Sequence, residues 1–171
     1  MTLHDILILA KFYLNIKDPD NREEILLKCC NICYRFTAQN YLPLYYSETV
    51  AVNNGIVFFR DLEKNIITLK KVTKPDKAGA RYTLHGDRIE TPEPEIVIAY
   101  TYLPDETGLN DTLAYGGGRV DARLLALGAA AEFCLITGLY DDAAVFDARY
   151  NDAVRAAQRR AGGSVRERRF K

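Results

Sequence analysis

The sequence is poor in the residues that most often carry covalent chemistry. Its 171 residues include two serines, Ser47 and Ser164, two histidines, His4 and His85, and no tryptophan. Neither serine lies in the Gly-x-Ser-x-Gly pattern of a nucleophile elbow. We therefore expect no catalytic residues, no cofactor and no enzymatic activity.

Long apolar runs are also absent. No stretch approaches the roughly 20 apolar residues that cross a bilayer, so we expect no membrane span. The start lacks a basic region, and its apolar stretch is interrupted by Lys11 and Asn15, so we expect no secretion signal. A composition of 48% hydrophobic and 27% charged residues is ordinary for a globular protein, and the length fits one domain, which we place at residues 1–161.

Cysteine is scarce, and its spacing does not favour a metal site. The four cysteines are Cys29, Cys30, Cys33 and Cys134. Structural zinc sites take about four ligands, usually as two separated pairs, and the second pair is missing here. Without a secretion signal a disulfide framework is not expected either. The sequence therefore favours buried thiols that pack as small hydrophobic side chains.

The formal net charge is zero, but it is unevenly distributed. Residues 159–171 carry a net charge of +5, so the other residues sum to −5. Such an arm either docks on an acidic partner, protein or nucleic acid, or is a solubilising end. The candidate partner-binding residues are Arg159, Arg160, Arg166, Arg168, Arg169, Phe170 and Lys171.

The pattern of apolar residues predicts an α+β fold. Residues 2–40 should form two helices, the first capped by Thr2 and the second begun by Asp18 and Pro19. In the second helix, Ile25, Cys29, Ile32 and Phe36 trace an apolar stripe, widened by Leu26, Cys30 and Cys33, that we expect to face the core. The helix should end near Asn40, before the Leu42-Pro43 step.

Residues 44–103 alternate with a period of two and predict an antiparallel sheet or small barrel. Asn53-Asn54-Gly55 is a hairpin signal, and short strands are expected at 56–59, 66–72, 81–84, 88–91 and 96–103. Residues 119–160 then predict an antiparallel helical hairpin that turns at Gly138, with Leu135 among the apolar residues of its first helix. Gly162 begins the basic arm, residues 162–171.

Two further segments could carry chemistry. Gly116-Gly117-Gly118-Arg119 precedes a helix and could cradle a phosphate, but it lacks the P-loop ending, and a connector is the simpler interpretation. Asp105, Glu106, Asp111 and Asp121 could bind a cation but do not follow the calcium-loop pattern. We therefore predict neither a phosphate site nor a metal site.

Glu132 and the tyrosines have structural interpretations as well. Glu132 lies in an otherwise apolar helix, so it either faces outward or pairs with Arg149 or Arg155. Tyr41, Tyr45, Tyr46, Tyr82, Tyr100 and Tyr102 could stack on bases, but few arginines accompany them. We favour packing and protein interfaces for these rings.

This layout resembles a tailed-bacteriophage head–tail connector, also called an adaptor or head-completion protein. The sharpest similarity is the run from Ala126 to Tyr150, with its small-residue helix, Gly-aromatic turn and aromatic, acid, x, Arg-Tyr helix. The strand that ends at Tyr100-Thr101-Tyr102-Leu103-Pro104 and the terminal Arg168-Arg169-Phe170 are also similar. Together these elements span nearly the whole chain. The β region is larger than in the smallest all-helical connectors.

The resemblance implies a virion protein of the neck or tail region, made in the host cytoplasm. It implies a homo-oligomeric ring of twelve copies that binds the portal protein and other tail or nozzle proteins, while genomic DNA passes through the channel. The arm would reach the portal, where its arginines pair with acidic side chains and Phe170 anchors. An acidic body would avoid retarding the DNA. The alternative is a small nucleic-acid-binding module that uses the basic arm.

Overall fold

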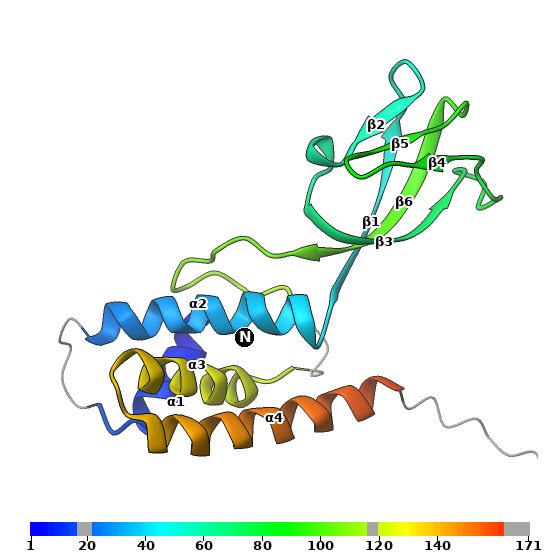
Figure 1. Cartoon of the computed structure of the whole chain (residues 1–171). Helices are drawn as coiled ribbons and strands as arrows, with labels where there is room; N and C mark the ends of the chain where they lie inside the picture. The colour runs from blue at the N-terminus through cyan, green and yellow to red at the C-terminus, as the bar shows by residue number, and fades with distance from the viewer. Residues whose placement is uncertain (17–21, 116–119, 163–171) are drawn as a thin grey trace, which may run out of the picture. The chain divides into compact units, whose positions relative to one another are not determined.

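The computed structural model describes residues 1–16, 22–115 and 120–162 and divides the chain into two compact units. The helical unit combines residues 1–42 with the chain from residue 106 onward, and the β unit comprises residues 43–105. Within the described residues the helical unit holds α1 to α4 and the β unit holds β1 to β6 (Figure 1). The predicted α+β fold is confirmed. We predicted a single domain over residues 1–161. Whether the two units form one domain depends on how they associate, so this stays a prediction.

The first helix begins where its cap was predicted. α1 spans Leu3–Tyr13, and the Thr2 backbone N–H donates to Asp5 Oδ2 at 2.7 Å while the Asp5 N–H donates to Thr2 Oγ1 at 3.3 Å. This reciprocal capping box satisfies two backbone donors that a helix start otherwise leaves unpaired. α2 spans Arg22–Asn40 and ends before Pro43, as predicted. The predicted start at Asp18 and Pro19 lies outside the described residues.

The predicted buried face of α2 is wrong in part. Leu26 and the three cysteines of the stripe are buried as expected, but Ile32 and Phe36 are exposed. The buried residues of α2 are Leu26, Cys29, Cys30, Cys33, Tyr34, Thr37 and Ala38. α2 is apolar on more than one face, and the face that becomes buried is the one that packs against α3.

The helical hairpin forms as predicted, and its turn follows helix-capping rules. α3 spans Ala122–Ile136 and α4 spans Tyr140–Gly162. Gly138 adopts a φ of 79°, and the Leu139 N–H donates to Cys134 O at 2.8 Å, which are the features of a Schellman motif. α3 contacts α1, α2 and α4, so most of its side chains are buried. Leu135 is an exception to our prediction, because it lies near the turn, where it is half exposed.

The β unit contains two three-stranded antiparallel sheets. In the first, β6 (Glu95–Leu103) lies between β1 (Leu44–Ala51) and β3 (Asn65–Thr73). In the second, β5 (Arg88–Glu90) lies between β2 (Ile56–Phe58) and β4 (Thr83–Leu84). Antiparallel pairing is therefore confirmed, with the strands divided between two sheets.

Both sheets contribute to one core. It is formed by buried residues of β2, β3, β5 and β6, together with Leu62, which follows the short 3-10 helix η1 (Phe59–Asp61). The members are Val57, Leu62, Val72, Ile89, Ile96, Ile98 and Tyr100. The alternation predicted for the last strand is visible here, since Ile96, Ile98 and Tyr100 share the buried face. The predicted turn at Asn53-Asn54-Gly55 is also present, with positive φ values of 54° at Asn54 and 77° at Gly55.

Candidate interaction surface

The loop carboxylates have local structural partners. Asp121 Oδ1 accepts the Leu124 N–H at 2.8 Å and caps α3, while Asp111 Oδ2 accepts the Gly108 N–H at 2.7 Å. Glu106 pairs with Arg35 at 3.4 Å, and in the β unit Asp105 accepts a hydrogen bond from Asn65. Over residues 1–16, 22–115 and 120–162, no group of three His, Cys, Asp or Glu side chains is arranged to hold a metal ion.

The four cysteines lie in the interior of the helical unit. All four are free thiols, and all four are buried. Burial raises the pKa of Cys29 to about 11 and that of Cys33 to about 12, from an ordinary value of 9.0. Since the thiolate is the nucleophile, thiols with such raised pKa values are poor nucleophiles at neutral pH.

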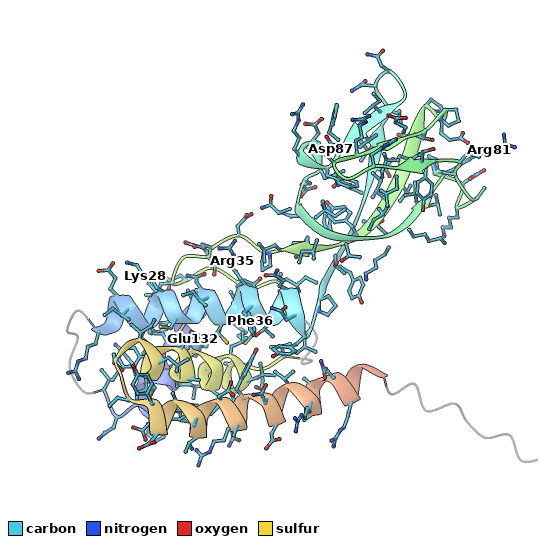
Figure 2. The ribbon with its side chains drawn as sticks, in the orientation of Figure 1. Lys28, Arg35, Phe36, Arg81, Asp87 and Glu132 are labelled. Carbon is cyan, nitrogen blue, oxygen red and sulfur yellow. The ribbon has the colours of Figure 1, made fainter. Side chains whose placement is uncertain are left out.

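A groove of about 260 Å³ lies between α2, α3 and α4. Phe36, Tyr41 and Leu135 give it apolar walls, and Glu132 and Asp147 line it as acids. Figure 2 shows Phe36 on α2 and Glu132 on α3 beside each other. Among the described residues Glu132 has no ion pair with Arg149 or Arg155, and Arg155 instead contacts Asp152 at 3.7 Å. Glu132 is thus partly exposed at the groove.

Cys33, Gly128 and Tyr150 also line this groove, and Thr37, which sequence reasoning did not single out, is hydrogen-bonded to Tyr150. Tyr150 Oη and Thr37 Oγ1 lie 2.8 Å apart and share a hydrogen bond, and the Thr37 hydroxyl lies 2.7 Å from Cys33 O. A Cβ on Gly128 would lie 2.3 Å from Cys33 Sγ and 3.0 Å from the Tyr150 ring. The signal in the sequence was the glycine inside a helical pattern, which often marks close packing.

The tyrosines pack mainly against other side chains. Tyr46 contacts Tyr100 and Tyr102 edge to face, and Tyr41 contacts Phe36 and Tyr150 in the same way. Tyr100 is buried, and its hydroxyl donates to Glu48 at 2.5 Å. Tyr45 and Tyr82 are the exposed members of the predicted set. This arrangement agrees with the packing interpretation of the rings.

Among the described residues, exposed apolar side chains are most frequent along the chain around the turn between α3 and α4. Five of them, between 49% and 69% exposed, lie within eleven residues: Leu135, Ile136, Leu139, Tyr140 and Val145. Three carboxylates accompany them, Glu132, Asp141 and Asp142, and we call the eight residues together the hairpin-end surface. No lysine, arginine or histidine occurs between Glu132 and Ala148. An apolar surface with acids and no bases is suited to a partner that is apolar and cationic.

The predicted partner-binding arm is described only where it begins. Arg159 lies on the exposed face of α4. The side chain of Arg160, and all of Arg166, Arg168, Arg169, Phe170 and Lys171, lie outside the described part of the chain. The Gly116-Gly117-Gly118-Arg119 segment lies outside it as well.

The described residues contain no helix that is both long enough and apolar enough to span a membrane. No protein family model matches the chain, and no curated protein matches it.

Proposed function

We propose that this chain is a structural virion protein, a head–tail connector of a tailed bacteriophage. In this proposal copies of the chain form a ring, of twelve by analogy, that joins the portal protein to the tail or nozzle proteins around the DNA exit channel. The chain acts by binding and not by catalysis. The hairpin-end surface is the observation that carries the proposal, because it lies in the same α3–α4 hairpin that resembles connector proteins.

The chemistry of the side chains supports a binding role. A cluster of exposed apolar side chains at one end of a helical hairpin is typical of a protein–protein interface. Asp121 caps the N-terminus of α3, Asp141 and Asp142 lie exposed in the first turn of α4, and the thiols are buried and protonated. The described side chains therefore suit a binding surface. Among them no nucleophilic side chain is paired with a general base, as a catalytic site of that kind requires.

The test is binding to a portal ring. The full chain would be mixed with the portal protein that the proposal assigns to it as a partner and separated from free chain by velocity sedimentation. We expect the chain to sediment with the portal. Replacing Leu139 and Tyr140 by Asp should abolish this co-sedimentation, whereas replacing Leu84, an exposed apolar residue of the β unit, by Asp should leave it unchanged. A chain that stays free beside a portal able to bind its other partners would contradict the proposal.

The basic arm supports a second candidate, a nucleic-acid-binding module. That function requires binding of DNA by the isolated chain, with an affinity that falls steeply as salt is raised because phosphate contacts release counterions. Fluorescence anisotropy of a labelled duplex at two salt concentrations separates the two candidates.

A further inference from the structure

The carboxylates of the hairpin-end surface have no cationic partner in the described helical unit. None of Glu132, Asp141 or Asp142 takes part in an ion pair there. On the facing helix α2, Lys28 is already paired with Glu24, with Nζ and Oε1 2.8 Å apart. Asp141 and Asp142 stabilise the first turn of α4 through the helix dipole, but this leaves their outer oxygen atoms open to a further cation.

The exposed apolar residues add a second requirement for the occupant. Leu139 and Tyr140 are about half or more exposed beside the two aspartates, so a fitting partner presents an aromatic or aliphatic side chain next to positive charge. The chain itself contains such a segment, because its last six residues are Arg166-Glu167-Arg168-Arg169-Phe170-Lys171. Arginines pair well with exposed carboxylates, and the phenylalanine that follows Arg169 can cover the apolar residues.

The backbone of the arm is shorter than the distance that separates the end of α4 from these aspartates. α4 runs from Tyr140 to Gly162, so Asp141 lies about 31 Å from Gly162 along the helix axis at 1.5 Å per residue. Arg168 follows Gly162 by six residues, which span at most about 22 Å when fully extended. Arg169 follows Gly162 by seven residues, which span at most about 25 Å. An arm of the same chain could therefore meet these aspartates only if it ran back fully extended along the whole of α4, whereas an arm of another copy meets them without this constraint.

We propose that the part of the basic arm that follows α4, residues 163–171, binds the hairpin-end surface of a second copy. The arginines pair with Asp141 and Asp142 while Phe170 covers Leu139 and Tyr140. The two partners use different surfaces, so the contact is head to tail and can repeat from copy to copy until a ring closes. The inference rests on the proposed function, because a connector ring needs such a repeating contact. The binding partner that it assigns to the arm is a second copy of the chain, and not the portal protein or DNA.

The test reverses the charges on each side and measures self-association of the full chain by analytical ultracentrifugation. The arm variant is R168E/R169E and the hairpin variant is D141K/D142K. We expect each variant alone to associate at least about tenfold more weakly than the wild type, because like charges then face each other across the contact. Mixing the two variants should restore association, since each reversed surface meets its complement on the other chain. The control D61K/D87K, which changes two exposed acids of the β unit, should associate like the wild type.

The outcomes separate the possible arm partners. Restoration on mixing, with unchanged circular dichroism for both variants, supports the contact between copies. A wild type that is monomeric at all concentrations, or variants that associate as strongly as it does, overturns the inference. Loss of duplex DNA binding by R168E/R169E with unchanged self-association also overturns it, in favour of nucleic acid. No portal protein is present, so failure here is distinct from failure of the connector proposal.

Discussion

Gly128 shows how a single residue sets the packing of the helical unit. Its missing side chain lets α3 approach Cys33 of α2 and Tyr150 of α4, where a Cβ would lie 2.3 Å and 3.0 Å from their atoms. These neighbours are buried, so they have little freedom to move aside. The close approach in turn holds Tyr150 within hydrogen-bonding distance of Thr37.

Replacing Gly128 by alanine should therefore destabilise the fold. We expect a loss of about 1–3 kcal/mol in the free energy of unfolding, since overpacking outweighs the helix propensity that alanine gains. Urea denaturation followed by circular dichroism measures this loss in the free energy of unfolding. The matched control is Gly79→Ala, because a Cβ at Gly79 meets nothing within 4 Å. Equal stability of the two variants would contradict this account of the packing.

The buried thiols predict a loss of stability at alkaline pH. Their pKa values are raised by burial, to about 11 for Cys29 and about 12 for Cys33, so the folded chain holds these protons more tightly than the unfolded chain. The stabilisation is complete below the unfolded pKa of about 9 and is lost as pH rises toward the folded values. Each thiol should cost about 1.4 kcal/mol per pH unit within that window.

Urea denaturation at pH 8 and pH 10 tests this linkage. The free energy of unfolding should be lower at pH 10, and Cys29→Ala should show a smaller difference between the two pH values. A difference unaffected by that substitution would mean that other groups cause the alkaline loss.

Among the elements, those with local signals were predictable. Thr2 and Gly138 act through contacts within a few residues, so their roles at a helix start and a helix end could be predicted from sequence. The exposure of Ile32, Phe36 and Leu135 could not be predicted in this way. Their exposure depends on which face of α2 meets α3 and on where the hairpin turns, and both depend on contacts between distant parts of the chain. The hairpin-end surface was missed for the same reason.

The N-terminus of α3 gives an element-scale prediction. Asp121 accepts the Leu124 N–H at 2.8 Å, so Asp121→Ala should cost about 1 kcal/mol of unfolding free energy, while Asp121→Ser should retain most of the cap. Thermal unfolding of both variants measures the difference. An alanine variant as stable as the serine variant would show that this cap contributes little.

At the scale of the whole molecule, the chain is built from two units with separate cores. The β unit receives the chain at β1 and releases it at β6, and these ends are paired, with Leu44 opposite Tyr102. Its own core contains seven buried residues. Insertion of such a unit between α2 and α3 leaves its two ends close together, which is the arrangement that domain insertion favours.

We therefore expect residues 43–105 to fold when expressed alone. This fragment should give dispersed amide signals in a nitrogen–proton correlation spectrum and a cooperative thermal transition. Val57→Asp places a charge in the core and should abolish both, while Thr49→Asp changes an exposed position and should not. Collapsed amide signals for the wild-type fragment would show that the β unit needs the helices to fold.

The connector proposal concerns assembly, so it is tested most directly by imaging an assembly. The measurement is negative-stain electron microscopy of the full chain mixed with the portal and tail proteins that the proposal assigns to it as partners. We predict an additional ring stacked on the portal, present with the wild-type chain and absent when the chain is omitted. Portal particles identical with and without the chain, under conditions in which the portal binds its other partners, would contradict the account.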